Sequence, residues 1–162
     1  MTSPAAGHLL VRLARPSDAE AVRDVHVASI RRLCAADCTE AQIDAWARPA
    51  PLADYRAAIQ GSPFFVAEFG RELAGFSEVD LGRAEVKAVY VHPDHVRRGA
   101  GLALMAQLEA AARDAQCGEL WLDSSLTAVS FYEATGFTVV RSMTHQLASG
   151  PIIPCVRMSK TL

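Results

Sequence analysis

The sequence has little of the cysteine pattern that marks a metal-binding or disulfide-rich protein. Its four cysteines are Cys34, Cys38, Cys117 and Cys155, and none of them forms a Cys-x-x-Cys pair. Besides Cys34 and Cys38, His26 is the one nearby residue of a type that binds zinc. A zinc site is therefore the weaker interpretation of these cysteines. We therefore expect reduced structural thiols in a reducing compartment, and no bound metal.

Long apolar runs and a strong charge of one sign are also absent. No apolar stretch reaches the roughly 18 residues that a membrane-spanning helix needs, and the stretch that begins at Leu9 is interrupted by Arg12. A formal net charge of −2 provides no broad positive field for nucleic acid. We expect a cytoplasmic protein with neither a membrane nor a nucleic acid as its partner.

Two common nucleotide-binding motifs are missing as well. The sequence contains no Gly-Lys-Ser or Gly-Lys-Thr, which excludes a P-loop. Gly99 and Gly101 could begin a dinucleotide-binding motif, but Leu104 stands at the third glycine position and the segment lies past the middle of the chain. A nucleotide hydrolase and a dehydrogenase are therefore disfavoured.

What is present suits one folded domain. The chain has 162 residues, of which 51% are hydrophobic, and this is enough for a complete core. Neither a repeat nor a low-complexity stretch nor a linker interrupts it. We expect residues 1–162 to form a single domain, with residues 1–7 disordered.

Hydrophobic periodicity predicts a mixed α/β sheet. A first helix is expected after a capping box at 17–20, and a second after a box at 39–42. A longer helix from Leu102 should run about four turns, with Gly118 as its C-terminal cap. Shorter helices are predicted at 54–60 and 128–135, and strands at 9–13, 63–69, 71–80, 85–91, 119–124, 137–146 and 152–160.

The most informative segment is 91–102, where a strand ends, a glycine loop follows and the long helix begins. Glycine has no Cβ, so the loop backbone can approach an oxyanion closely, and the positive end of the helix favours negative charge there. Arg97 and Arg98 add positive charge at the same corner. The segment therefore predicts a receptor for a phosphate group.

Two segments resemble the GCN5-related N-acetyltransferase (GNAT) superfamily. Residues 96–101 resemble the motif that opens the family's central helix, with Val96 where glutamine or arginine is usual. Residues 125–137 are similar to its late segment. In that segment Ser125 replaces an asparagine, and the residues that match are Ala128, Tyr132, Gly136 and Phe137.

The resemblance implies a fold and a cosubstrate. The fold is a single α/β domain with a mixed, mostly antiparallel sheet, helices on both faces and a splayed central strand pair. The cosubstrate is acetyl-CoA, with its pyrophosphate held by the glycine loop. The residues that the resemblance assigns to its binding are Val89, Tyr90, Val91, Val96, Arg97, Arg98, Gly99, Ala100, Gly101, Leu102, Ser125 and Ala128.

Transfer of an acetyl group from a thioester to an amine requires proton donors and acceptors. The departing thiolate needs a proton, and Tyr132 is the expected donor, because a phenol with a pKa of about 10 is neutral at pH 7. The amine must lose a proton, and a carboxylate would accept it. Glu78 is our first choice for this base and Glu85 the second. Asp80 shares the strand and face of Glu78, and Asp123 lies on the strand after the long helix.

We therefore expect an N-acetyltransferase that acts on a primary amine of a small molecule or peptide. No cysteine lies in the motifs at a place suited to a covalent intermediate, which favours direct attack in a ternary complex. The alternative is a non-catalytic module that binds acyl-CoA as a sensor or docking domain. The resemblance places the early helices beside the acceptor, where Trp46 and Tyr55 are either part of the acceptor site or packing residues. His26 is either a core residue or part of that site, and the chain could be a monomer or a homodimer.

Overall fold

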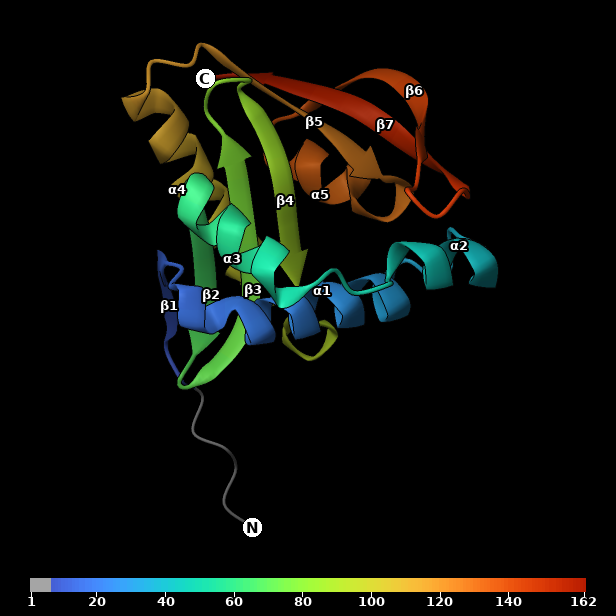
Figure 1. Ribbon diagram of the computed structural model, residues 1–162. Coiled ribbons are helices and arrows are strands. Elements are labelled where there is room, and N and C mark those ends of the chain that lie inside the picture. Colours follow the sequence, from blue (N-terminus) through green and yellow to red (C-terminus); the bar gives the residue numbers. More distant parts are fainter. Residues whose placement is uncertain (1–6) are drawn as a thin grey trace.

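The computed structural model describes residues 7–162. Of the residues expected to be disordered, 1–7, all except Gly7 therefore lie outside the described residues. The structure contains a sheet in the order β1-β2-β3-β4-β5-β7-β6 (Figure 1). The elements are β1 (Leu9–Leu13), α1 (Ala19–Leu33), α2 (Glu40–Trp46), α3 (Leu52–Gly61), β2 (Phe64–Phe69), β3 (Glu72–Asp80), β4 (Glu85–Val91), α4 (Ala100–Asp114), β5 (Glu119–Ser125), α5 (Val129–Ala134), β6 (Thr138–Gln146) and β7 (Ile152–Thr161).

The mixed, mostly antiparallel sheet predicted from the sequence is confirmed. Neighbouring strands are antiparallel everywhere except at the β4–β5 pair, which is parallel. Strand bounds agree with the predicted ones to within one residue. Glycines at the turns explain this agreement: Gly70 ends β2 with a φ of +65°, a left-handed conformation that glycine adopts at little cost.

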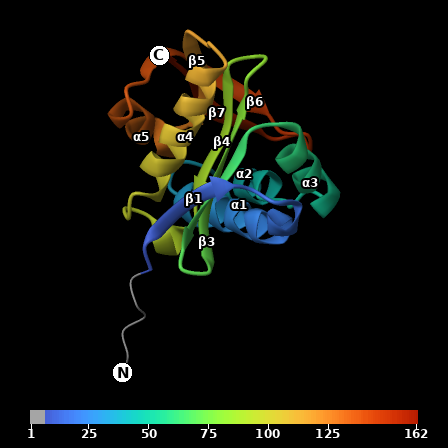
Figure 2. The same ribbon diagram turned by 90° about the vertical axis from the view of Figure 1, so that its left-hand side faces the viewer.

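Helices cover both faces of the sheet. Figure 2 shows α4 and α5 on one side, and α1, α2 and α3 on the other. The side chains of β2 alternate accordingly, because successive residues of a strand point to opposite faces. Val66 is buried with α1 and α3, whereas Ala67 is buried with α4. The β-strands therefore separate two cores, and the central strands reach both.

β4 and β5 separate after a single contact. Their register contains one pair, Glu85 with Trp121. Further along β4, the His92 N–H donates to the Ala74 carbonyl oxygen of the β3 side at 2.7 Å. Because N–H directions alternate along a strand, those of Val89 and Val91 point away from β3, into the gap toward β5. The splayed strand pair thus leaves donors without a strand partner.

The predicted cap of the first helix is wrong. Pro16–Asp18 forms a 3-10 turn, and α1 begins only at Ala19. Instead of the box at 17–20, the Asp18 carboxylate accepts a hydrogen bond from the Arg15 N–H at 2.7 Å. Proline explains the difference, since its fixed φ suits the first position of a helical turn and starts that turn directly after Arg15. The second predicted box, Thr39 with Gln42, is confirmed.

The predicted C-terminal cap of the long helix is also wrong. α4 ends at Asp114, and Gln116 rather than Gly118 adopts the left-handed conformation, with a φ of +62°. The Cys117 N–H donates to the Ala112 carbonyl oxygen and the Gln116 N–H to the Arg113 carbonyl oxygen, both at 2.9 Å. These two bonds form a Schellman motif, which satisfies the last carbonyls of the helix. The motif outweighs the strain of a non-glycine residue.

A buried ion pair joins α4 to β7 and to the end of α5. Lys160 Nζ lies 2.6 Å from Glu109 Oε1 and donates to the Thr135 carbonyl oxygen at 2.6 Å. Glu109 is only 8% exposed, and a buried carboxylate is costly unless it is paired. The pair therefore fixes α4 relative to α5, and both helices border the site described below.

The four cysteines are free thiols, and Cys34 and Cys155 are buried. Within residues 7–162, none of the helices is both long and apolar enough to cross a membrane. The same residues contain no cluster of three or more histidine, cysteine or acidic side chains that could hold a metal ion.

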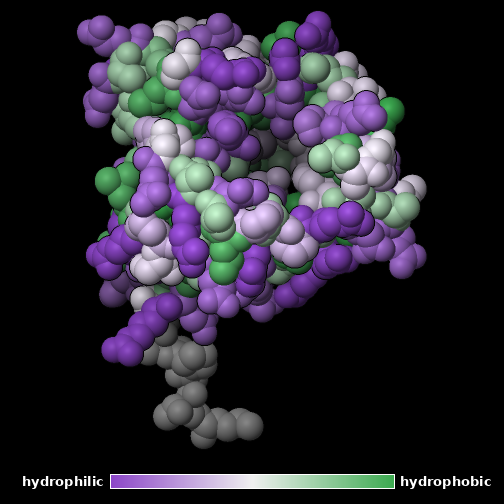
Figure 3. Space-filling model, in the orientation of Figure 1, coloured by the Kyte–Doolittle hydropathy of each residue, from purple (hydrophilic) through white to green (hydrophobic). Residues whose placement is uncertain are grey.

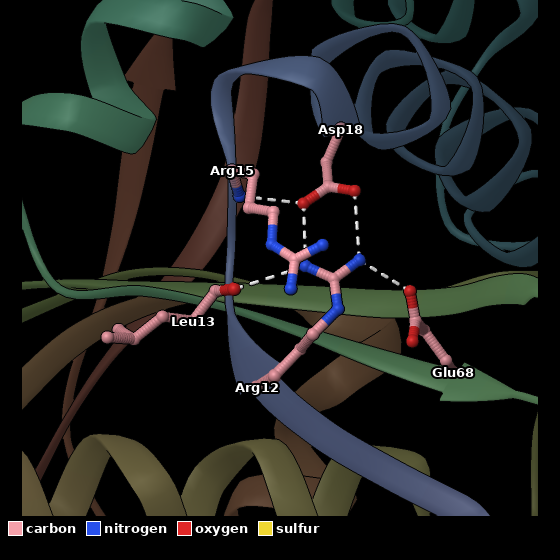
Figure 4. A network of polar contacts seen from close by, with 5 residues as sticks. All are labelled: Arg12, Leu13, Arg15, Asp18 and Glu68. Atoms are coloured by element: carbon pink, nitrogen blue, oxygen red, sulfur yellow. Dashed lines mark hydrogen bonds and ion pairs between the residues drawn. The ribbon is translucent and has the colours of Figure 1, made fainter.

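An arginine and two carboxylates fasten β1 to β2 and to the start of α1 (Figure 4). Arg12 donates to both oxygens of Asp18, at 2.8 and 3.0 Å, and to Glu68 Oε1 at 2.5 Å. The side chains are 14–22% exposed. Because the pairing with Asp18 is bidentate and largely shielded from water, it should contribute more than a surface ion pair.

We expect Asp18→Asn to lower the free energy of unfolding by about 2 kcal/mol at neutral pH, the usual value for a hydrogen bond to a charged group. Hydrogen bonding from Arg12, and then from the Arg15 N–H, holds the pKa of the Asp18 carboxyl below its ordinary value. A carboxyl lowered in this way stabilises the fold above its unfolded-state pKa of about 4, and the contribution is lost as the pH falls through the folded-state value.

Urea titrations of both proteins at neutral and at strongly acidic pH would measure this difference, which should vanish in acid. Asp24→Asn is the control, since that side chain is 70% exposed and its contact with Arg23 is 3.8 Å long. A loss of stability in Asp18→Asn that persists unchanged in acid would contradict the assignment.

Candidate functional site

The glycine loop takes the conformation that close approach of an oxyanion requires. Gly99 precedes α4 with a φ of +87°, in the left-handed region. α4 begins at Ala100, two residues earlier than predicted, so Gly101 belongs to its first turn. A Cβ on Gly101 would lie 3.0 Å from Phe131 Cε2 and 3.6 Å from Val91 Cγ2. The absence of side chains therefore keeps both the turn and the space beside it open.

A cavity of about 490 Å³ lies against this loop, where β4 and β5 have separated. The face drawn in Figure 1 is visibly hollowed near its centre, over the same region between the two strands (Figure 3). The cavity is lined by Ser29, Leu33, Cys34, Val89, Tyr90, Val91, His95, Val96, Arg97, Gly99, Ala100, Gly101, Leu102, Ser125, Thr127, Ala128, Phe131 and Ala134. Three parts of the chain therefore form it: α1, the segment from β4 to α4, and the segment from Ser125 to α5.

The residues predicted to bind the cosubstrate lie along this cavity, with one difference in position. All of them line it except Arg98. The Arg98 guanidinium lies 3.8 Å from the centre of the Phe69 ring, and its Nη1 is 2.9 Å from His95 Nδ1. Arg97, with a φ of +60°, is the arginine on the cavity wall. Aromatic stacking thus directs one arginine of the pair onto β2.

Sequence reasoning did not identify the wall that α1 contributes. Ser29, Leu33 and Cys34 lie on that wall, although the sequence pattern indicated only an apolar helix stripe. Ser29 is 5% exposed, and a small polar residue inside such a stripe was the available signal. Burial raises the pKa of the Cys34 thiol, which keeps it protonated.

Tyr132 lies on α5, directly after the cavity-lining Phe131, but is itself packed in the core. It is 7% exposed, and its ring makes edge contacts with Phe131 and Phe137 at centroid distances of 5.1 and 5.7 Å. Burial raises the pKa of the Tyr132 phenol above its ordinary range, and the nearby Tyr90 adds to this effect. The phenol is therefore neutral at physiological pH and holds its proton firmly.

Glu78 lies on the other side of β4. It lines a second cavity of about 260 Å³, which is open to solvent and lies between α1, α3 and strands β2, β3 and β4. Its side chain is 12% exposed, and its Oε1 accepts from Ser62 Oγ at 2.8 Å and lies 3.8 Å from Lys87 Nζ. Glu78 pairs with Ala88 in the sheet register, one residue from Val89. Tyr90 lines both cavities and thus separates them.

The other carboxylates considered from the sequence already have partners. Glu85 pairs with Arg83 at 3.1 Å, and Asp123 forms two hydrogen bonds of 2.8 Å with Arg157. Asp80 accepts from the Arg83 N–H at 3.1 Å and so closes the turn after β3. Glu78 is the member of this group that lines the cavity beside Tyr90, and together with Asp80 it also lines a neighbouring cavity of about 510 Å³.

His26 and Tyr55 also face the second cavity. The phenol oxygen of Tyr55 lies 2.9 Å from His26 Nδ1, and burial lowers the pKa of His26 to about 4. His26 is therefore neutral at physiological pH, because burial disfavours its charged form. Trp46 instead packs with Ile43 and Ile30 in the small core between α1 and α2.

Comparison with known proteins supports the interpretation of these segments. A family model described as "Acetyltransferase (GNAT) domain" matches residues 34–162. A search of curated proteins found no match. The matched range contains the glycine loop, both strands of the splayed pair and Tyr132, but begins near the end of α1.

Solved structures of similar fold cover nearly the whole chain. A GCN5-related N-acetyltransferase from Rhodopseudomonas palustris, also described as a class-II aminotransferase, is 29% identical over 99% of this chain and 100% of that one, with a TM-score of 0.91. PaiA N-acetyltransferase from Thermoplasma acidophilum, in complex with coenzyme A, is 20% identical over 96% and 99%, with a TM-score of 0.74. YncA from Salmonella typhimurium, with its cofactor acetyl-CoA, is 20% identical over 96% and 95%, with a TM-score of 0.73. With its glycine loop, its splayed strands and a matching family model over most of its length, the chain belongs to the GNAT family of acetyltransferases.

Proposed function

We propose that this protein transfers an acetyl group from acetyl-CoA to a primary amine, and that residues 1–162 form one N-acetyltransferase domain. The observation that carries the proposal is that two cavities meet at Tyr90. One cavity beside it is lined by the glycine loop and the free edge of β4, and the other contains a shielded carboxylate. The donor can therefore bind in the gap between β4 and β5 and the acceptor in the cavity that contains Glu78, with Tyr90 between them.

The larger cavity fits acetyl-CoA. Its pyrophosphate would lie at the glycine loop, where the N-terminus of α4 and Arg97 favour negative charge. The N–H groups of Val89 and Val91 point into the gap and can donate to the amides of the pantetheine arm and to the acetyl carbonyl. These donors would also stabilise the carbonyl oxygen as it gains negative charge during attack.

The reaction we propose is a direct attack. The amine nitrogen forms a bond to the acetyl carbon and the bond from that carbon to sulfur breaks. The amine proton passes to Glu78, which lies beside β4, and Tyr132 gives a proton to the departing thiolate. Cys34 lines the cavity, but its raised pKa makes it a poor nucleophile, which argues against an acetylated cysteine intermediate.

Thermal unfolding in the presence of acetyl-CoA, coenzyme A, ATP and NAD tests the proposal. We expect acetyl-CoA and coenzyme A to raise the melting temperature, because a ligand that binds only the folded state stabilises it by mass action. Stabilisation by ATP or NAD alone would overturn the proposal. Release of free thiol in the presence of amines then distinguishes an enzyme from the alternative, a sensor that binds acyl-CoA without turnover.

A further inference from the structure

Five of the eleven residues that line the cavity containing Glu78 have aromatic rings. His26 comes from α1, Tyr55 from α3, and Phe64, Phe76 and Tyr90 from three adjacent strands. Phe76 stacks on Phe64 and on Tyr90, with centroid distances of 5.5 and 5.4 Å. His26 meets Tyr90 at 4.6 Å. We call this cavity the aromatic pocket.

Glu78 lies in the aromatic pocket with one of its two carboxylate oxygens free of hydrogen bonds within residues 7–162. The hydrogen bond from Ser62 and the long contact with Lys87 both involve Oε1 of Glu78. Among the described residues, none donates a hydrogen bond to Oε2 of Glu78. The other acidic residue of the lining, Asp54, is exposed at the rim. Neutral His26 does not compete for Glu78, and Lys87, the cation of the lining, is 48% exposed with its Nζ 3.8 Å from the carboxylate, so Glu78 can still accept one ammonium group.

The aromatic pocket borders the proposed reaction site. Glu78 pairs with Ala88, and the next residue, Val89, presents its N–H to the gap between β4 and β5. Tyr90 forms part of both cavities. An amine held at Glu78 would therefore lie at the edge of β4 while the rest of the acceptor contacts the rings.

We propose that the aromatic pocket is the acceptor site, and that it selects a small primary monoamine with an aromatic body, such as phenethylamine. This inference rests on the proposed function and specifies its substrate class. A volume of about 260 Å³ suits a compact molecule. Aromatic walls favour an aromatic occupant through edge and stacking contacts. A polyhydroxylated amine with several charges would leave most of its polar groups unpaired, because Glu78 is the one shielded carboxylate of the lining.

Steady-state thiol release measures this preference. We expect kcat/KM for phenethylamine to exceed that for ethylamine by about 30-fold or more, the effect of burying a phenyl ring. Kanamycin, a polyamine, and glycylglycine, a polar peptide amine, should be poorer acceptors still. An equal or higher kcat/KM for any of these three would overturn the inference.

Two neighbouring alanines of α3 provide a matched pair of variants. Ala58 lines the aromatic pocket, whereas Ala57 is exposed and lies outside it. Ala58→Leu should fill the pocket and reduce kcat/KM for phenethylamine about tenfold or more, while ethylamine is affected little. Ala57→Leu carries the same added volume on the same helix and should change neither value. Equal effects of the two substitutions would overturn the inference.

Replacement of the carboxylate tests the recognition of charge. Glu78→Gln should lower kcat/KM for phenethylamine about 100-fold, because the variant loses both the ammonium partner and the proton acceptor. Glu119→Gln, at an exposed carboxylate on β5, is the surface control and should leave activity unchanged. Full activity of Glu78→Gln would overturn the assignment of the acceptor site.

Binding of acetyl-CoA separates the failure of this inference from the failure of the proposed function. If acetyl-CoA raises the melting temperature but other amines are preferred, or no amine is acetylated, the inference is overturned and the donor site stands. If acetyl-CoA does not stabilise the protein, the proposed function fails, and the inference fails with it. Stabilisation by acetyl-CoA together with preference for phenethylamine supports both.

Discussion

Replacing either glycine of the loop with alanine, in Gly99→Ala or Gly101→Ala, should weaken acetyl-CoA binding about tenfold or more. At Gly99, alanine would have to adopt a φ of +87°, which costs an L-residue about 1–2 kcal/mol. A loop that relaxes to avoid this strain would no longer direct its N–H groups at the pyrophosphate. A loss of about 1.4 kcal/mol in binding already corresponds to a factor of ten.

At Gly101 the reason is steric. The added methyl group would lie 3.0 Å from the ring of Phe131, closer than ordinary van der Waals contact, and it would occupy the space between Phe131 and Val91. Both of these residues line the cavity. The substitution therefore either narrows the cavity or displaces α5.

Isothermal titration with acetyl-CoA would measure both losses. Gly118→Ala is the control, because a Cβ there meets no atom within 4 Å and its φ is not in the left-handed region. Val96→Ala should weaken binding less than either glycine substitution, since backbone groups rather than this apolar side chain are expected to contact the phosphates. Unchanged affinity for acetyl-CoA in both glycine variants would show that this loop does not bind the pyrophosphate.

Tyr132→Phe should lower kcat by about two to three orders of magnitude while leaving the affinity for acetyl-CoA nearly unchanged. Burial keeps the Tyr132 phenol protonated, so its hydroxyl is present as a hydrogen-bond donor to the developing thiolate, and phenylalanine lacks this donor. The ring contacts with Phe131 and Phe137 persist in the variant, so the fold and the donor cavity should be retained.

Single-turnover kinetics and titration with acetyl-CoA, carried out on the same preparation, would separate chemistry from binding. Tyr90→Phe is the comparison variant, since Tyr90 is the other tyrosine whose pKa is strongly raised by burial and it borders both cavities. A large loss of kcat in Tyr90→Phe, with none in Tyr132→Phe, would identify Tyr90 as the proton donor to the thiolate. Full activity in Tyr132→Phe would leave Tyr132 as a core residue.

Local sequence features predicted the elements because their causes are local. The strand predicted at 85–91 has the bounds of β4 in the structure. The box of Thr39 and Gln42 predicted the start of α2, since both halves of the motif lie within one turn. Where the predictions were wrong, at Asp18 and at Gln116, a competing backbone motif nearby satisfied the same groups in a different way.

The glycine loop and the late segment around Tyr132 were recognisable for a related reason. A left-handed turn followed by a helix depends on neighbouring residues, so Gly99 and Gly101 carry the information themselves. Arg98 shows the limit of such reasoning. It is adjacent to Arg97 in sequence, yet it stacks on Phe69 of β2, 29 positions earlier in the chain, and so leaves the cavity wall to Arg97.

By itself, the sequence determined the order of strands and helices, the glycine loop and the resemblance to the GNAT family, because each depends on spacing within a short segment. Only the tertiary structure decided which residues share a cavity. The separation of β4 from β5, the wall from α1 and the rings around Glu78 join elements that are distant in the chain. Burial then sets the chemistry of these groups, since removal from water keeps His26 neutral and Tyr132 protonated.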